Sequence, residues 1–270
     1  MPTAISTQSA KFEPPAVLAR LGGCIFAAAI IALGAETLVC ARNVSHSLGP
    51  QYDVIPVLPW LPAISWLGYI FGAIWVFCGA GLLSPPARRN AAMTLGTLLF
   101  LCTVILDVPK NLADIGSIPL RTIVFEPFAI ACLAFLIAGS DALPGWLMRG
   151  SRYLLALSLI VFGVDHFLAL IFIANLIPRW IPFHVFWVAF FGVAFIATGI
   201  SIAFRFLHRW AAAGLGLMFA IWVVTLHLPR VLGLYGIPGA PHNPNEWSSL
   251  FIAVALWGGL WALTGDQRAS

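Results

Sequence analysis

Long apolar segments, separated by short polar turns, dominate the pattern of hydrophobic and polar positions along the chain. A helix needs about 20 mostly apolar residues to cross the roughly 30 Å of hydrocarbon in a bilayer. The apolar segments approach this length, and each is closed by proline, arginine or a polar turn. They run over residues 17–40, 60–83, 90–108, 122–139, 152–175, 182–204, 210–228 and 247–264. The pattern therefore predicts an all-α, polytopic membrane protein with eight transmembrane helices.

The composition excludes an ordinary soluble domain. Of the 270 residues, 61% are hydrophobic and 9% are charged, and the mean hydropathy is +0.96. The net charge of +4 does not indicate a nucleic-acid partner, because the basic residues stand singly or in pairs beside apolar segments and form no patch. The five cysteines form no CxxC motif or metal-finger spacing, so we interpret them as small buried hydrophobic residues. The lipid bilayer is the expected partner.

The distribution of Lys and Arg between the two sides of the membrane predicts the orientation. With eight spans both termini share a side, which collects nine basic residues: Lys11, Arg20, Arg88, Arg89, Arg149, Arg152, Arg205, Arg209 and Arg268. The opposite side receives five: Arg42, Lys110, Arg121, Arg179 and Arg230. The positive-inside rule then places both termini in the cytoplasm, with residues 1–16 and 266–270 as tails. We expect the inner membrane of a bacterium, with no cleavable signal peptide before the first span.

An internal repeat relates the two halves of the chain. Residues 62–139 match residues 182–259 at a constant offset of 120 without a gap. The matched pairs include Gly72 and Gly192, Gly79 and Gly199, Arg89 and Arg209, Pro109 and Pro229, Lys110 and Arg230, and Glu126 and Glu246. Upstream the offset is 129, which places Glu36-Thr37 on Asp165-His166. Four spans per repeat is an even number, so the two predicted membrane units, 17–140 and 141–265, insert the same way up.

Ionisable residues gather in the outer half or at the outer edge of the predicted spans. Such a group is costly within hydrocarbon, so each is by default a functional candidate that faces the bundle interior. The candidates for ligand binding or proton relay are Glu36, Asp107, Lys110 and Glu126 in the first unit and Asp165, His166, His184, His227, Arg230 and Glu246 in the second. The windows place Asp165 and His166 mid-helix, about 13 Å from the end of their span. There we favour function over an internal polar latch between helices, because no cap or interface explains them.

Structural roles explain part of this set. Glu126 and Glu246 begin their predicted spans, where a carboxylate caps free amides and meets the positive end of the helix dipole. Lys110 and Arg230 stand at span exits. Snorkelling, contact with an anion or headgroup, and a salt bridge to the neighbouring glutamate are alternative roles for these two cations.

The imidazoles raise the question of a cofactor. His166, His184 and His227 are potential metal or haem ligands, but no HExxH, HxH or CxxC motif fixes two ligands on one face. The aromatic segment from Phe183 to Phe191 offers a lining for a flat apolar ring such as a quinone, and lipid-facing packing explains it equally well. The cofactor stays open, with a quinone ahead of a metal or haem, and no catalytic residue is identified.

Several short motifs of the second unit carry a family resemblance. They are Gly163-Val164-Asp165-His166-Phe167, Trp180-Ile181-Pro182-Phe183, the pair Gly192 and Gly199, and Asn243-Pro244-Asn245-Glu246-Trp247 followed by Gly258-Gly259. On these residues the chain resembles the DoxX-like superfamily of four-helix membrane proteins, over nearly its whole length and as two tandem units. The resemblance implies a group with few assigned activities. Among them are a membrane subunit of a thiosulfate to quinone oxidoreductase, proteins of membrane redox and sulfur homeostasis, and cargo or assembly factors. It implies no set of catalytic residues, and the fused pair departs from the usual single unit.

These observations predict a membrane protein whose outward-facing polar layer binds a small molecule, a quinone or a lipid headgroup, as the membrane partner of a redox system. A small-solute or proton-coupled transporter is the first alternative, because parallel repeats with carboxylates at helix boundaries also suit alternating access. The outer position of the charges weighs against it, since a transporter is expected to hold charges near the midplane. A non-catalytic assembly or cargo factor is the second alternative.

Overall fold

All secondary structure in the described part of the computed structural model, residues 14–40, 65–139, 143–237 and 239–265, is helical. The elements in chain order are α1 Ala16–Cys40, α2 Ser65–Leu83, α3 Arg88–Cys102, η1 Thr103–Asp107, α4 Val108–Ala113, α5 Ile118–Ala138, α6 Gly145–Leu168, α7 Leu170–Leu176, α8 His184–Phe204, α9 His208–Trp222, η2 Val223–His227, α10 Leu228–Val231, η3 Ala240–His242 and α11 Pro244–Ala262. The elements η1 and η2 are π-helical, and η3 is a 3-10 helix. The all-α prediction is confirmed.

Helices suited to a bilayer make up most of the described residues. Six stretches there are long and apolar enough to cross a membrane: Ala16–Cys40, Arg88–Ala113, Ile118–Ala138, Gly145–Leu168, His184–Phe204 and His208–Val231. They support an integral membrane protein. The predicted window 60–83 is described only from Ser65 onward, and α11 opens on polar residues, Asn245 and Glu246. The count of eight spans therefore stays a prediction.

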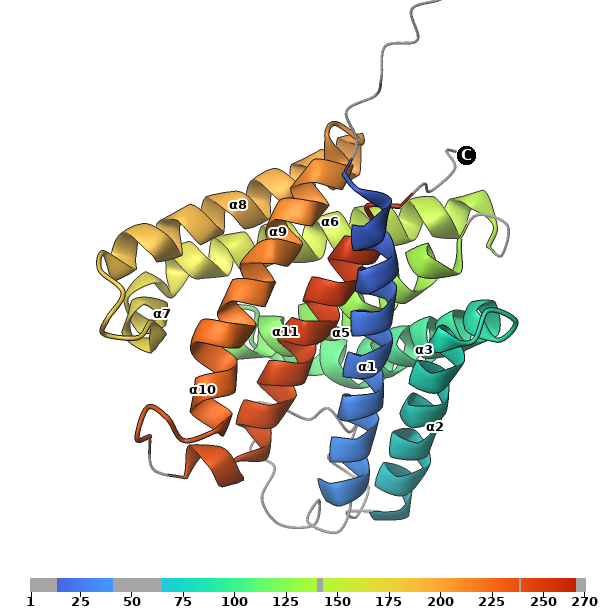
Figure 1. The fold of residues 1–270 in the computed structure, drawn as a ribbon, viewed down its shortest axis with the longest axis horizontal. Helices are drawn as coiled ribbons and strands as arrows, with labels where there is room; N and C mark the ends of the chain where they lie inside the picture. Colours follow the sequence, from blue (N-terminus) through green and yellow to red (C-terminus); the bar gives the residue numbers. More distant parts are fainter. Residues whose placement is uncertain (1–13, 41–64, 140–142, 238, 266–270) are drawn as a thin grey trace, which may run out of the picture.

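Contacts between the long helices arrange them in two layers. In one layer α2 packs on α1, α1 on α11 and α11 on α9; in the other α3 packs on α5, α5 on α6 and α6 on α8. Figure 1 shows the helices of the second layer running across those of the first. The layers meet where α2 contacts α3, α8 contacts α9 and α5 contacts α11. Each layer thus holds two helices from the first half of the chain, α1 to α5, and two from the second half, α6 to α11.

The helix ends that carry the candidate residues are called the polar ends below. They are the C-terminal ends of α1, α6, and the α3–η1–α4 and α9–η2–α10 stretches, together with the first turns of α5, α8 and α11. In Figure 1 the short helices α7 and α10, which follow α6 and α9, lie toward the left and lower left, and α1 ends at the bottom of the view.

The two halves share an irregularity at the same place. The stretch α3–η1 covers residues 88–107, and α9–η2 covers residues 208–227, 120 positions later. Proline explains the π-helical turn: Pro229 has no amide hydrogen for the carbonyl of Thr225, and that carbonyl instead accepts a hydrogen bond from the hydroxyl of Tyr235. The amide of Leu228 reaches back five residues instead of four. Pro109 stands at the matching position of the first half.

Helix α6 ends before the fifth predicted window does. The window 152–175 is apolar throughout, but the backbone of Ala169 leaves the helical region (φ −105°, ψ 25°), and α7 follows as a separate short helix. Asp165 and His166 therefore lie in the last turn of α6. The prediction that they lie mid-helix is wrong, because hydropathy does not register a break between two apolar residues.

Helix α5 begins before the predicted start at residue 122. The Ser117 hydroxyl accepts a hydrogen bond from the Leu120 amide at 3.4 Å, and Pro119 occupies the first turn; both features favour a helix start. Glu126 therefore lies about 12 Å along α5, and the prediction that it begins its span is wrong. Its match Glu246 does lie in the first turn of α11, as predicted.

Helices α1 and α11 approach each other backbone to backbone. A Cβ atom at Gly258 would lie 2.3 Å from the amide nitrogen of Phe26, and one at Gly22 would lie 2.3 Å from that of Ala262. Close contacts between small residues are typical of helices packed within membranes. They hold the first helix of the first half against the last helix of the second.

Candidate functional site

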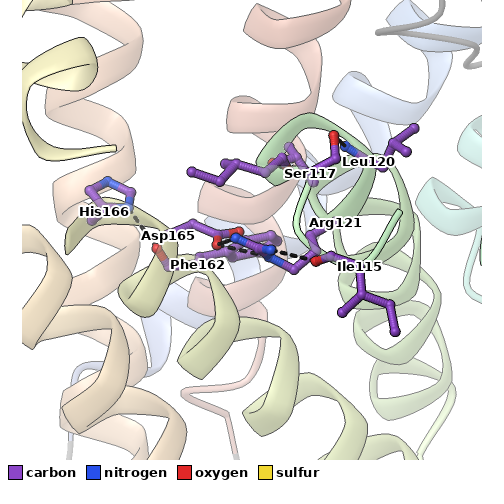
Figure 2. Close-up of polar contacts among 9 residues, drawn as sticks. Ile115, Ser117, Leu120, Arg121, Phe162, Asp165 and His166 are labelled. Carbon is purple, nitrogen blue, oxygen red and sulfur yellow. Dashed lines mark hydrogen bonds and ion pairs between the residues drawn. The ribbon is translucent and has the colours of Figure 1, made fainter. Parts of the chain in front are cut away.

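A buried ion pair joins the two halves within the second layer. Figure 2 shows Arg121 reaching from the start of α5 toward Asp165 on α6; its Nε and Nη2 atoms lie 3.0 and 2.6 Å from Oδ1 of Asp165. Nη1 donates to the carbonyl of Ile115 at 2.7 Å, which fixes the guanidinium plane. The side chains of Arg121 and Asp165 are 16% and 7% exposed. The geometry supports the role of an interhelical latch for Asp165.

The adjacent His166 points away from this ion pair (Figure 2). Its Nδ1 lies 2.7 Å from the carbonyl of Phe162, so Nδ1 carries the proton and donates it to that oxygen. Nε2 is then the acceptor nitrogen, and among the described residues it is buried without a hydrogen-bond partner. The ring stacks on Trp222 of α9, with 5.6 Å between centroids, and lies 5.0 Å from the ring of Phe195 of α8. The result is an oriented, neutral imidazole between aromatic walls.

Glu36 occupies the position in α1 that Asp165 occupies in α6. Its Oε1 accepts a hydrogen bond from the hydroxyl of Ser248 on α11 at 2.6 Å. Thr37, at the position that matches His166, turns its hydroxyl back to the carbonyl of Leu33 at 2.8 Å. The matching positions of the first layer therefore also join the two halves, through a hydroxyl group and without an imidazole.

A second ion pair lies between α10 and α11. The Nε atom of Arg230 lies 2.8 Å from Oε2 of Glu246, and Nη2 binds the other carboxylate oxygen. This confirms the alternative of a salt bridge between Arg230 and the neighbouring glutamate. His227 precedes Arg230 by one turn and lies within electrostatic reach of both charges.

The matching cation of the first half has a different partner. The Nζ atom of Lys110 lies 3.7 Å from Oδ1 of Asp107, one turn earlier in the same helical stretch. Glu126, which matches Glu246, forms no hydrogen bond or ion pair with any residue that the structure describes, and its side chain is partly buried. The difference follows from one position: Asp107 pairs with Lys110, whereas His227 stands in its place in the second half and Arg230 pairs with the glutamate.

The three candidate imidazoles of the second half do not meet. His184 is the first residue of α8 and is partly buried. Across the described ranges, no group of three or more His, Cys, Asp or Glu side chains is placed to hold a metal ion. The hypothesis that His166, His184 and His227 converge as metal or haem ligands therefore has no geometric support. The candidates form separate small groups at the polar ends.

Three residues of these groups, Arg121, Ser248 and Trp222, are not among the sequence candidates. A signal existed for Arg121, because a carboxylate within a span needs a cation at the same depth and Arg121 stands on the expected side. Ser248 and Trp222 carry no comparable signal, since hydroxyl groups and indoles are common in membrane helices.

Comparison of the chain with protein-family models, with curated proteins and with solved structures gave no match. The fold and the site define an all-helical integral membrane protein with paired charges at one set of helix ends. Its function has to be inferred from the geometry of these groups.

Proposed function

We propose that the protein is a DoxX-like membrane protein that binds a quinol at His166 and serves as the membrane partner of a redox system. The observation that carries the proposal is the buried Nε2 of His166, which lacks a hydrogen-bond partner among the described residues while Nδ1 is held by Phe162. A quinol hydroxyl is the type of donor that this nitrogen accepts. Trp222 and Phe195 pack against the imidazole ring and fix the direction in which this nitrogen points.

The proposed chemistry requires the protein to bind the quinol and to accept a proton from it. Oxidation of a quinol to a quinone releases two electrons and two protons. The redox partner is the oxidant and takes both electrons. His166 Nε2 accepts one proton from the hydroxyl bound to it, and the other hydroxyl releases its proton to water at the polar ends. The Arg121–Asp165 pair positions the end of α6 against α5 and leaves the imidazole facing α8 and α9.

The proposal includes two parallel four-helix repeats in the inner membrane of a bacterium, with both termini in the cytoplasm. The recurrence of the π-helical turn after 120 residues supports the repeat. The positive-inside bias supports the orientation, which places the polar ends at the outer face. The quinol then enters from the outer leaflet.

Lipid extraction of detergent-purified protein tests the proposal. Mass spectrometry of the extract should find a quinone retained by the wild type and by His184→Ala, and reduced at least tenfold in His166→Ala. His184 is the control, because it is an imidazole of the second half that lies at the start of α8, is only partly buried and does not belong to the proposed site. Circular dichroism checks that both variants are folded. Equal retention of the quinone by all three proteins would contradict the quinol site. A phospholipid retained in place of a quinone would indicate a lipid-headgroup site instead.

A small-solute or proton-coupled transporter is the second candidate. The observation that favours it is the pair of π-helical turns before Pro109 and Pro229, since such irregularities are frequent at functional sites and in the broken helices of transporters. Reconstituted protein should then move solute or protons across a vesicle membrane, and Pro229→Ala should slow the flux. Protein that neither binds a quinone nor supports flux would fit an assembly or cargo factor.

A further inference from the structure

We infer that Glu126 is a proton-binding site within the membrane, separate from the proposed quinol site. Three observations carry this inference: the depth of Glu126 in α5, the lack of any ion-pair or hydrogen-bond partner among the described residues, and the contrast with Glu246 at the matching position. The ligand is a proton, exchanged with the side of the polar ends.

The position of Glu126 along α5 excludes a role in capping the helix. Glu126 lies about 12 Å along α5, beyond the first turn, where no free helix amides remain for it to cap. Glu246 lies in the first turn of α11, where capping is available. The side chain of Glu126 is only partly buried among the described residues, and it belongs to a helix that is long and apolar enough to cross a membrane.

The charges on the elements packed against α5 are engaged elsewhere. Asp107 of η1 binds Lys110 of α4, Asp165 of α6 binds Arg121 at the start of α5, and Glu246 of α11 binds Arg230. The other described ionisable groups of α3 and α6 are Arg88, Arg89, Cys102, Arg149, Arg152, Tyr153 and His166, and none forms an ion pair or hydrogen bond with Glu126.

An unpaired carboxylate anion is costly in hydrocarbon, whereas the neutral acid needs only one acceptor for its proton. An acceptor is available on the same helix. Pro127 has no amide hydrogen, so the carbonyl of Ile123, one turn before Glu126, lacks its helical partner. Glu126 is therefore held as a neutral acid and loses its proton when a stronger acceptor arrives.

A hydrophobic carbodiimide distinguishes the two glutamates, because it reacts with a neutral acid in lipid and not with an ion-paired carboxylate. The acid proton moves to a carbodiimide nitrogen, the carboxyl oxygen bonds to the central carbon, and the adduct rearranges to a stable N-acylurea. Full-length protein in native membranes, treated with dicyclohexylcarbodiimide at neutral pH, should carry the adduct on the peptide that contains Glu126. We expect at least tenfold less on the peptide that contains Glu246. The variant E126Q should lose the adduct, and E246Q should keep it on Glu126. Equal labelling of the two glutamates, or none at Glu126, would overturn the inference.

Infrared spectroscopy provides a second readout that does not depend on access of the reagent. The wild type should show the C=O stretch of a neutral carboxylic acid, shifted by exchange into D₂O, and part of this absorbance should be lost in E126Q and kept in E246Q. A wild-type spectrum without this band would also overturn the inference. Neither experiment involves a quinol, so the quinol site and the proton site are tested independently.

Discussion

In the first half of the chain the candidate carboxylates are Glu36, Asp107 and Glu126; the second half has Asp165, His227 and Glu246 at the matching positions. The π-helical turn recurs in both halves, 120 residues apart. What differs is which charges are satisfied. In the second half both carboxylates form ion pairs with arginine. In the first half Glu36 binds a hydroxyl and Glu126 binds no described residue.

This difference indicates how the two halves of the chain can have different roles. Ion pairs hold the carboxylates of the second half as anions and leave the imidazole of His166 as the group open to a ligand. The first half has Thr37 instead of that imidazole, and it keeps a carboxyl group without a counter-ion. We therefore assign ligand binding to the second half and proton binding to the first.

The contacts between the halves also differ in kind. The first helix of each half binds the last helix of the other, α1 to α11 and α6 to α5. The α6–α5 contact contains a buried ion pair, whereas the α1–α11 contact contains a hydroxyl–carboxyl hydrogen bond and glycine packing. The two contacts should therefore contribute different amounts to the free energy of unfolding.

The largest effect is expected at the ion pair. Arg121→Ala leaves Asp165, whose side chain is 7% exposed, as a buried carboxylate without its cation. Removal of one partner of a buried pair costs about 3–5 kcal/mol. Unfolding in mixed micelles measures the loss. The double variant Arg121→Met, Asp165→Leu removes both charges and should recover most of it, whereas a loss in Arg121→Ala below about 1 kcal/mol would contradict the latch.

The next effect is expected where α1 meets α11. A side chain at Gly258 collides with the backbone of Phe26, so Gly258→Leu should lower the free energy of unfolding by about 1–3 kcal/mol or more. The matching residue of the first half is Ala138, at the end of α5, which already carries a Cβ atom and is only partly buried. Ala138→Leu should cost less than about 1 kcal/mol in the same assay. Equal losses would show that the two contacts between the halves are packed alike.

A smaller effect is expected for the hydroxyl that binds Glu36. Ser248→Ala removes one hydrogen bond to the carboxyl group and should cost about 1 kcal/mol. The neighbouring Ser249 is a matched control on the same helix, and Ser249→Ala should change the free energy of unfolding by less than about 0.5 kcal/mol. If Ser248→Ala cost as much as Arg121→Ala, the distinction between an ionic and a neutral contact would fail.

The sequence predicted the helical class and gave the pairing of Arg230 with Glu246 as one of three alternatives, because hydropathy and opposite charges at neighbouring helix ends are local signals. It misplaced the ends of α5 and α6, and with them Glu126, Asp165 and His166. The two errors have different causes. The break at Ala169 lies between apolar residues and has no marker in the sequence, whereas the start of α5 is marked by Ser117 and Pro119, which hydropathy alone does not register.

The partner of Asp165 could not be derived from the pattern alone. Arg121 and Asp165 are 44 positions apart, and their contact depends on how α5 packs against α6. The open nitrogen of His166 depends similarly on Trp222 and Phe195, which belong to two other helices. Periodicity within one segment carries no information on such packing between segments.

The last prediction has the smallest expected effect on stability, and it tests whether the two halves have the same orientation in the membrane. Ser117 and Ile237 occupy matching positions, 120 residues apart, before α5 and α11, and both are partly buried. In a variant without the five native cysteines, Ser117→Cys and Ile237→Cys should both react with a membrane-impermeant maleimide added outside the cell. Ser84→Cys, in the turn between α2 and α3, should react only after the membrane is opened. Ser117 makes one weak capping contact, so its replacement should cost about 0.5–1 kcal/mol at most. Labelling of the first two sites from opposite sides would mean that the halves are inverted, and matched positions would then no longer share a depth or a face of the membrane.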